Sequence, residues 1–378
     1  MENIGLITFH AAHNCGSIMQ AFALQTKVKQ LGYNCEIIDF SNKGQKELYE
    51  IFSKRKTLKK YVRNLVLYPH KRRLKLHFKN YEDFIRKNLI LSSKKYEEYK
   101  ELESEKFNYD TFVCGSDQIW NVTIKDYDDA YFLPFVKDKP KIAYAPSFGA
   151  KNIEKHVQDI DKYRKYLNDF NFLSVREQNG QKWINNITGK TVQVILDPTL
   201  LINREIYDKL ERTSNIIDDY IFYYAPNYKK DIDKFVKEIS KKYNLKVIAW
   251  NTKDYILKGL KYKGFELAKE QDPGIYLNLI KNAKIVITTS FHGTIFSSIY
   301  RKNFWTIKNG NMYSDDDRVI TLINQLGLTE RLIEPKFDDK WDYFQKVDYT
   351  KYNNNIDGLK KQSLEYLELA LKGKNNEK

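Results

Sequence analysis

A chain of 378 residues with 42% hydrophobic residues can bury a sizeable core, and its length suggests two domains. The three cysteines are few, odd in number and without a C-x-x-C pair, so they exclude a disulfide framework and favour a reducing compartment. The sequence shows no secretory signal and no apolar stretch of membrane-spanning length. We therefore expect a cytoplasmic protein.

The net charge of +15 is concentrated in residues 43–79, which hold 13 Lys or Arg residues against two acids. Three interpretations fit this basic block: the solvated face of a helical hairpin, a peripheral contact with anionic membrane or a phosphorylated lipid carrier, or a nucleic-acid-binding surface. No nucleic-acid-binding motif accompanies the charge, so we expect no nucleic-acid partner. The first two interpretations stay open, and the second would place the protein at the inner face of the membrane.

The chain opens with a strand–helix–strand pattern. Residues 4–9 are typical of a buried strand, and Ser17 is a suitable N-cap for a helix that Gly32 ends. Residues 35–40 predict the next strand. Such alternation favours parallel sheets with helices on their faces.

The alternation continues to the end of the chain. In the first half we expect a helix over 153–167 and strands over 110–115, 141–145, 172–175 and 191–196. In the second half we expect strands over 220–224, 246–249 and 283–288 and helices over 230–242, 272–282, 318–326 and 357–371. Two Rossmann-like halves with a cleft between them follow from this order.

Residues 286–294 (VITTSFHGT) are the most informative segment. A strand-like run ends in small polar residues, and then His292 and Gly293 precede a helix-like segment over 294–300. Open α/β sheets bind ligands at the carboxyl ends of their strands, and helix starts favour anions. A histidine satisfied within a tight turn is the alternative, but these neighbours favour a site.

Other strands also end in polar residues suited to one shared cleft, namely Asn14, Gly16, Ser116, Asp117, Ser147, Arg176 and Asp197. Arg176 could grip a carboxylate or phosphate through two parallel hydrogen bonds, or it could form an ordinary ion pair with Glu177. Asp117 and Asp197 could equally be turn or cap residues. Each signal is weak alone, and together they indicate a site.

The common nucleotide-binding fingerprints are absent from the sequence. His10 and His13 have no acidic partner nearby in the sequence, so we expect no metal site. The remaining set of one histidine, one or two arginines and several carboxylates suits acid–base group transfer with an anionic leaving group.

The chain resembles the polysaccharide pyruvyl transferases over about residues 3–330. Six motifs occur in that family's order: 14–20 (NCGSIMQ), 115–121 (GSDQIWN), 143–149 (AYAPSFG), 174–177 (SVRE), 196–200 (LDPTL) and 290–293 (SFHG). One departure matters, because many members have an arginine within an R-[FL]-H-G motif where this chain has Ser290. Arg318 is a candidate to replace that arginine.

The resemblance implies a GT-B-like α/β fold of two Rossmann-like domains whose parallel sheets face a central cleft. We expect an acceptor-side domain over 1–195 with a basic helical insertion at about 43–108, a donor-side domain over 196–345 and a helical tail over 346–378. The resemblance also implies transfer of pyruvate from phosphoenolpyruvate onto two hydroxyls of a sugar in a cell-surface polysaccharide or its lipid-linked precursor. This reaction forms a ketal and releases phosphate, with phosphoenolpyruvate as co-substrate and no further cofactor.

The family's histidine and the arginine of its V-R-[DE] motif carry over to His292 and Arg176. We expect His292 to act as general acid and Asp117 to orient or deprotonate the sugar hydroxyl. The other residues expected at the donor are Arg176, Ser290, Gly293, Thr294 and Arg318, and those at the acceptor are Asn14, Gly16, Gln20, Ser116, Ser147 and Asp197. Two alternatives are a GT-B glycosyltransferase that uses a nucleotide sugar and a non-catalytic protein that binds a glycan or lipid carrier.

Overall fold

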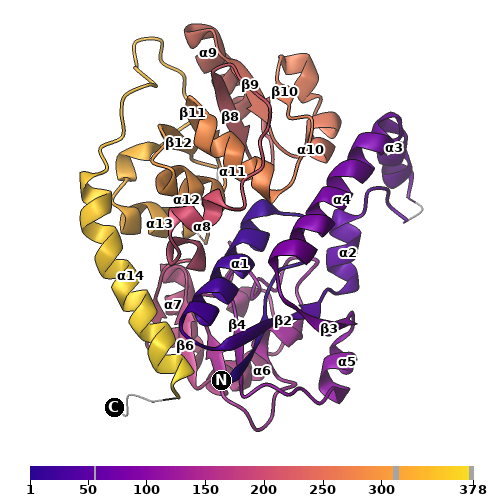
Figure 1. Ribbon diagram of the computed structural model, residues 1–378, viewed down its shortest axis with the longest axis vertical. Helices are drawn as coiled ribbons and strands as arrows, with labels where there is room; N and C mark the ends of the chain where they lie inside the picture. The colour runs from indigo at the N-terminus through magenta and orange to yellow at the C-terminus, as the bar shows by residue number, and fades with distance from the viewer. Residues whose placement is uncertain (55–56, 310–314, 374–378) are drawn as a thin grey trace.

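The computed structural model describes residues 1–54, 57–309 and 315–373 and shows two layered α/β domains, one above the other (Figure 1). Two stretches named above, 55–56 of the basic block and 374–378 of the tail, lie outside the described residues. Among the helices of the described chain, none has the length and apolar character needed to cross a membrane.

The first domain is built on a seven-stranded parallel sheet in the order β3-β2-β1-β4-β5-β6-β7. Its strands are β1 (Asn3–Ile7), β2 (Asn34–Phe40), β3 (Leu91–Tyr96), β4 (Thr111–Cys114), β5 (Lys141–Ala143), β6 (Phe172–Val175) and β7 (Gln193–Val194). Its main covering helices are α1 (Cys15–Gln30), α5 (Tyr99–Ser104), α6 (Ile160–Asn168) and α7 (Gln178–Thr188). Because β1, β4, β5 and β6 are neighbours, the loops after them meet at one edge of the sheet.

The second domain is built on a six-stranded parallel sheet in the order β10-β9-β8-β11-β12-β13. Its strands are β8 (Tyr220–Tyr224), β9 (Lys246–Ala249), β10 (Glu266–Leu267), β11 (Ile285–Thr288), β12 (Phe304–Ile307) and β13 (Leu332–Ile333). Its helices include α9 (Lys230–Tyr243), α10 (Thr252–Leu257), α11 (Pro273–Asn282), α12 (Phe291–Ile299) and α13 (Arg318–Leu326). Strands β8 and β11 are buried along their whole length, as their continuous apolar runs predict.

One hydrophobic cluster joins the two domains. It contains Ile18 of α1, Leu200 of the connection after β7 and Phe296 of α12, all fully or almost fully buried. The start of α1 is therefore packed directly against the second domain. This packing fixes the position of the loops that carry the site.

The last helix, α14 (Thr350–Leu371), returns from the second domain to the first (Figure 1). Its Tyr366 hydroxyl donates a hydrogen bond to the Ala143 carbonyl at 2.9 Å, and its Ser363 hydroxyl accepts one from the Leu196 amide at 3.1 Å. The predicted tail is thus a helix that fastens the two domains together.

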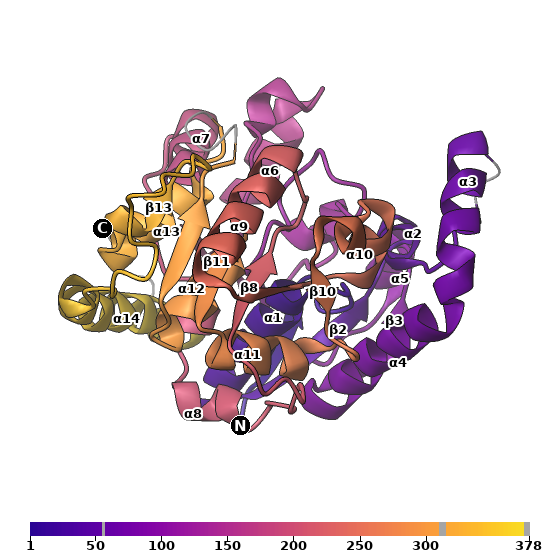
Figure 2. The same ribbon diagram turned by 90° about the horizontal axis from the view of Figure 1, so that it is seen from above.

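The basic block forms helices inserted between β2 and β3. These are α2 (Lys43–Tyr49), α3 (Leu58–Leu67), the short 3-10 helix η1 (Tyr68–His70) and α4 (Lys71–Asn88). Helix α3 stands away from the body of the protein at the end of this insertion (Figure 2).

Four of the predicted helix positions are wrong, and one of them is α14, which begins at Thr350 rather than at residue 357. Helix α1 is capped by Asn14 rather than Ser17, because the Asn14 side chain accepts hydrogen bonds from the Gly16 and Ser17 amides. Helix α12 begins at Phe291 rather than residue 294, because the Ser290 hydroxyl caps it.

The predicted helix over 153–167 is interrupted. A 3-10 turn, η3 (Ile153–Lys155), precedes α6, and the Asp159 side chain caps α6 by accepting a hydrogen bond from the Lys162 amide at 3.1 Å. The Asp159 cap fixes the start of α6 at Ile160, so residues 156–159 separate α6 from the 3-10 turn.

Candidate active site

Three loops bring an arginine, an aspartate and a histidine together where the two domains meet. Arg176 follows β6, Asp197 follows β7, and His292 lies in the first turn of α12. The Arg176 Nη1 donates a hydrogen bond to Asp197 Oδ2 at 2.8 Å, and His292 Nε2 lies 3.4 Å from the same oxygen. Adjacent strands of the first sheet thus supply two members, and the second domain supplies the third.

Asp197 is held in its charged form. Burial alone raises the pKa of this carboxyl, but the charge of His292 and its contact, followed by Arg176, bring the net pKa well below its usual range. The other oxygen, Oδ1, accepts hydrogen bonds from the Thr199 amide at 3.0 Å and the Thr199 hydroxyl at 2.6 Å. The imidazole of His292 thus faces a buried carboxylate whose two oxygens both have polar partners.

Gly16 of α1 lies against the imidazole of His292. A Cβ atom at Gly16 would lie 2.2 Å from His292 Nδ1 and 2.8 Å from its Cβ atom. Only glycine fits here without displacing the histidine. The absence of a side chain at Gly16 therefore allows His292 to reach the junction between the two domains.

Asp117 lies on the other side of Arg176, in the loop after β4. Its Oδ2 accepts a hydrogen bond from the Ser17 hydroxyl at 2.5 Å, and its Oδ1 lies 3.8 Å from Arg176 Nη2. Asp117 thus lies near the Arg176 guanidinium, and His292 contacts Asp197, the carboxylate that binds the same guanidinium. Ser17, predicted only as a cap, instead orients Asp117.

Glu177 is a member of this junction that the sequence analysis considered only as an ion-pair partner for Arg176. It is fully buried, its Oε1 accepts a hydrogen bond from the Phe148 amide at 2.9 Å, and its Oε2 lies 3.9 Å from Arg176 Nε. Burial raises the pKa of Glu177 to about 7, against the opposing charge of Arg176. Its position directly after Arg176, at the end of a buried strand, was the sequence feature that could have identified it as a site residue.

Several residues expected at the acceptor instead support the loop that carries Asp117. Gln20 accepts a hydrogen bond from the Ser116 amide at 2.8 Å, and the Ser116 hydroxyl donates to the Ala145 carbonyl at 2.6 Å. The Ser147 amide donates to the Asp117 carbonyl at 2.8 Å. Gln20, Ser116 and Ser147 are fully buried, so they position the loop from behind.

Three residues expected at the donor build the start of α12. The Ser290 hydroxyl accepts a hydrogen bond from the Gly293 amide at 3.2 Å, and the Thr294 hydroxyl donates to the Ser290 carbonyl at 3.0 Å. Thr294 is fully buried and also shares a hydrogen bond with the Thr306 hydroxyl. These contacts fix the helix turn that presents His292.

Arg318 reaches from α13 to the Asp117 loop, a proximity that the sequence left open. Its guanidinium binds both oxygens of Asp316, and Nη1 lies 3.3 Å from Gln118 Oε1. Burial lowers the pKa of Arg318, but Asp316 outweighs this effect and the net shift is upward, so the cation persists. Both candidate arginines therefore already have carboxylate partners.

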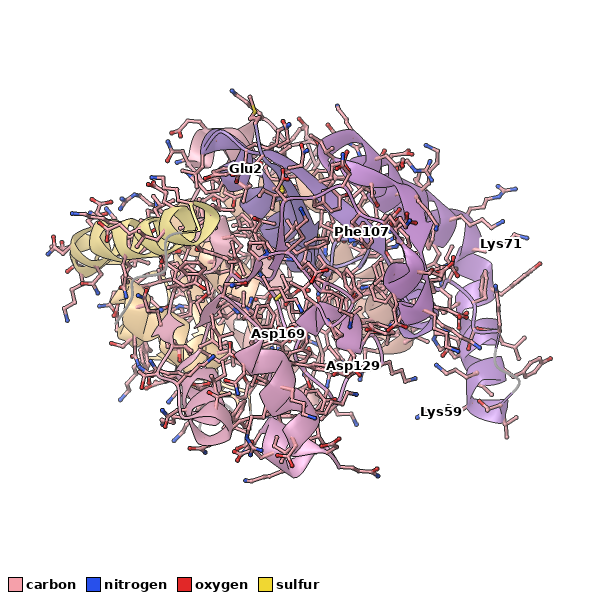
Figure 3. The ribbon with its side chains drawn as sticks, turned by 90° about the horizontal axis from the view of Figure 1, so that it is seen from below. Glu2, Lys59, Lys71, Phe107, Asp129 and Asp169 are labelled. Carbon is pink, nitrogen blue, oxygen red and sulfur yellow. The ribbon has the colours of Figure 1, made fainter. Side chains whose placement is uncertain are left out.

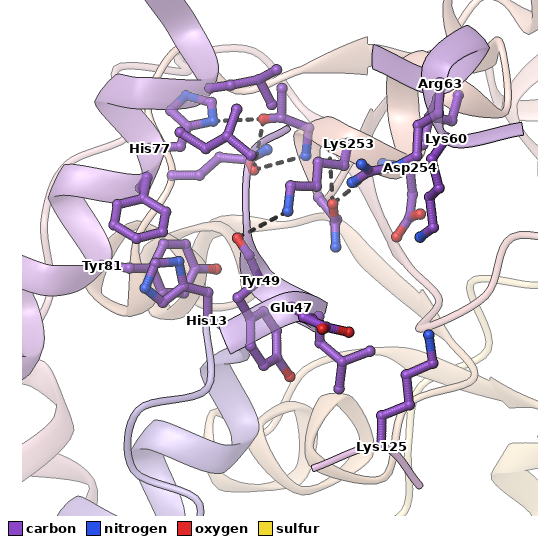
Figure 4. A pocket seen from close by; sticks show the side chains of 18 residues that line it. His13, Glu47, Tyr49, Lys60, Arg63, His77, Tyr81, Lys125, Lys253 and Asp254 are labelled. Atoms are coloured by element: carbon purple, nitrogen blue, oxygen red, sulfur yellow. Dashed lines mark hydrogen bonds between the residues drawn. The ribbon is translucent and has the colours of Figure 1, made fainter. Parts of the chain in front are cut away.

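A cavity of about 330 Å³ opens between the basic insertion and the second domain (Figure 4). His13, Tyr49 and Tyr81 form one side of it, with the His13 and Tyr81 rings stacked at 5.2 Å. The Tyr49 phenol has its pKa raised, first by burial and then by the Asp126 and Asp117 carboxylates. Lys125, from the connection after β4 that also carries Asp117, lines the cavity as well.

Basic side chains from both domains also line this cavity: Lys60, Arg63, Lys125 and Lys253, with Glu47 and Asp254 among them (Figure 4). Burial, and next the charge of Arg63, lower the pKa of Lys253 to about 8. In the described part of the chain, no group of three or more His, Cys, Asp or Glu side chains is arranged to hold a metal ion. The cavity offers an anion or a polar ligand cationic and aromatic partners.

Comparison with known proteins gives one family. The family model described as polysaccharide pyruvyl transferase matches residues 14–311. No curated protein matches the chain.

Two similar solved structures cover almost the whole chain. A UDP-N-acetylglucosamine 2-epimerase is similar with a TM-score of 0.53 and 9% identity, over 100% of this chain and 98% of that one. The S. aureus MnaA–UDP structure is similar with a TM-score of 0.49 and 10% identity, over 98% of this chain and 97% of that one. The first likeness, together with the two parallel sheets, confirms the GT-B-like fold.

Proposed function

Because the chain belongs to the polysaccharide pyruvyl transferase family, we propose that it moves pyruvate from phosphoenolpyruvate onto two hydroxyls of a sugar. The acceptor would be a polysaccharide or its lipid-linked precursor. The observation that carries this proposal is the contact of His292 with the ionised Asp197 beside Arg176. In this arrangement His292 can supply a proton next to an anion bound by Arg176.

The proposed reaction forms two C–O bonds and breaks one. Protonation of the methylene carbon of phosphoenolpyruvate makes the adjacent carbon electrophilic, and the first sugar hydroxyl adds to that carbon. Phosphate then leaves and the second hydroxyl completes the ketal. Of the two hydroxyl protons released overall, one balances the proton gained by the methyl group and the other leaves with phosphate.

His292 is the proposed donor of the methylene proton. Its Nε2 atom faces the ionised Asp197 carboxylate, and the contact with Gly16 holds its ring in place. Arg176 is the proposed partner of the phosphoenolpyruvate carboxylate or phosphate, which would compete with Asp197 for its guanidinium. Arg318 is the proposed second cation for phosphoenolpyruvate, because its contact with Gln118 places it beside the loop that carries Asp117.

The proposed acceptor route is the cavity between the basic insertion and the second domain. The rings of His13, Tyr49 and Tyr81 offer faces on which a sugar can pack. Asp117, held by the Ser17 hydroxyl, is the carboxylate we propose to orient the attacking hydroxyl.

The direct test incubates the full chain with phosphoenolpyruvate and a panel of sugar acceptors, following phosphate release and ketal formation by mass spectrometry. We expect phosphate release that depends on an acceptor and yields a pyruvylated product. His292→Gln should lower the rate by about 10²–10⁴-fold, the usual value of a general acid. The matched control is His156→Gln, because His156 is exposed and should leave the rate unchanged.

Two results would refute the proposal. Transfer of sugar from a nucleotide sugar, with phosphoenolpyruvate ignored, would mean that the protein is a glycosyltransferase. Binding of a glycan with no product, unaffected by His292→Gln, would mean that it is a binding protein.

A further inference from the structure

Helix α3 turns five apolar side chains outward, and two of its basic side chains, Lys60 and Arg63, line the cavity on its inner side. Leu58, Tyr61, Val62, Leu65 and Val66 follow the spacing of one helical stripe and are 80%, 61%, 51%, 55% and 44% exposed. These five residues are the outer face of α3. More exposed large apolar side chains of the described chain gather on α3 and η1 than on any other segment.

The inner side of α3 is held by the protein. Lys60 and Arg63 line the cavity, and Leu67 is fully buried. Asn64 exchanges two hydrogen bonds of 2.9 Å with the backbone of Ser53. The orientation of α3 is therefore fixed, and its outer face is left without a partner within the described chain.

Positive charge surrounds the outer face. Lys59 lies on α3 itself, and Lys71, Arg72 and Lys75 are exposed on α4. Lys59 and Lys71 extend from the protruding end of the insertion (Figure 3). An exposed apolar stripe bordered by lysine and arginine is the pattern that binds the interface of an anionic bilayer.

We propose that the outer face of α3 docks this protein on an anionic phospholipid bilayer. The helix has 10 residues, about 15 Å of length, which suits lying in the interface rather than crossing the bilayer. A second copy of the chain is a poorer occupant, because the net charge of +15 opposes the approach of two such surfaces. This inference does not rest on pyruvyl transfer.

Docking in this way has a consequence for the cavity. Lys60 and Arg63 project from α3 into the cavity, so the bound helix would hold the cavity beside the lipid headgroups. An acceptor carried on a lipid would then meet the cavity at the bilayer surface.

Co-sedimentation with vesicles tests the proposal, using phosphatidylcholine alone and phosphatidylcholine mixed with phosphatidylglycerol. The native chain should bind the mixed vesicles and ignore the neutral ones. Leu58→Gln/Leu65→Gln should weaken binding by about tenfold or more, because two apolar side chains no longer enter the interface. The matched control is Ile217→Gln/Tyr262→Gln, which replaces two apolar residues exposed elsewhere and should bind as the native chain does.

A charge variant keeps the test decisive if the first one folds poorly. Lys59→Gln/Lys71→Gln should weaken binding to the mixed vesicles by about fivefold for each charge removed. The proposal is overturned if the native chain ignores phosphatidylglycerol, or if a folded Leu58→Gln/Leu65→Gln chain binds unchanged. It is also overturned if light scattering shows a dimer that these leucine substitutions separate while no vesicle is bound, because a second copy then covers the face.

Discussion

Replacement of Gly16 by alanine tests whether the contact between α1 and His292 positions the histidine. Gly16 lies in the first turn of α1, where alanine suits the backbone, so the effect comes from the added methyl group alone. That methyl would lie 2.2 Å from His292 Nδ1, whereas ordinary contact begins at 3.4 Å, so the ring must recede by about 1 Å. The His292 Cβ atom, at 2.8 Å, prevents ring rotation from relieving the clash.

This displacement should lower both the stability of the protein and its turnover. Overpacking of a buried contact costs about 1–3 kcal/mol of unfolding free energy, which lowers the thermal midpoint by about 2–4 °C per kcal/mol in a domain of this size. Misplacement of a catalytic group by about 1 Å lowers turnover by about a hundredfold. Thermal unfolding and acceptor-dependent phosphate release from phosphoenolpyruvate measure the two effects on one preparation.

Gly358→Ala is the matched control. Gly358 lies in α14 with nothing within 4 Å of an added Cβ, so alanine there should stabilise the protein by up to about 1 kcal/mol and leave turnover unchanged. If Gly16→Ala behaves like this control in both assays, the contact does not position His292 and the reasoning fails.

Three further predictions concern the same junction. Asp197→Asn should destabilise the protein by about 3–5 kcal/mol, seen as a lower thermal midpoint, because it leaves the buried Arg176 guanidinium without its closest carboxylate. Burial raises the pKa of Glu177 from 4.5 to about 7, so its contribution to stability is complete below pH 4.5 and is lost as the pH rises to 7. Glu177→Gln should therefore flatten the fall in thermal midpoint across that range, and an unchanged slope would count against the assignment. Ser290→Ala should cost about 1 kcal/mol through loss of the α12 cap, measured by thermal unfolding, and no loss would show that the cap is dispensable.

The strands could be predicted from the sequence because each is a short apolar run bounded by polar residues. Strand β8 is a clear case, since its predicted range, 220–224, matches the structure. The helix starts were less accurate. Asn14 and Ser17 are both good caps by composition, and only the backbone conformation at Asn14 decides between them.

The proximity of several predicted site residues followed from the sequence, but their individual contacts did not. Parallel topology explains why the loops carrying Asp117, Arg176 and Asp197 meet. The approach of Gly16 to His292 depends on how the two domains pack, which no local pattern in the sequence records. The same is true of Arg318, whose partner Gln118 is 200 residues away in the chain.

The orientation of α3 in the basic block could not be predicted from the sequence either. The apolar spacing of α3 predicts a helix with one apolar face, but the sequence does not say whether that face meets the core or the solvent. The fixed contacts of Asn64 and Leu67 decide the orientation, and they exist only in the folded insertion.

A calorimetric titration with phosphoenolpyruvate, run beside UDP- and GDP-sugars, tests the central claim most directly. We expect saturable binding of phosphoenolpyruvate and none of the nucleotide sugars. Arg176→Lys keeps the charge but cannot donate two parallel hydrogen bonds to a carboxylate or phosphate. It should therefore weaken phosphoenolpyruvate binding by about tenfold or more. Binding of a nucleotide sugar alone, or phosphoenolpyruvate affinity indifferent to Arg176→Lys, would contradict a pyruvyl donor site at this junction.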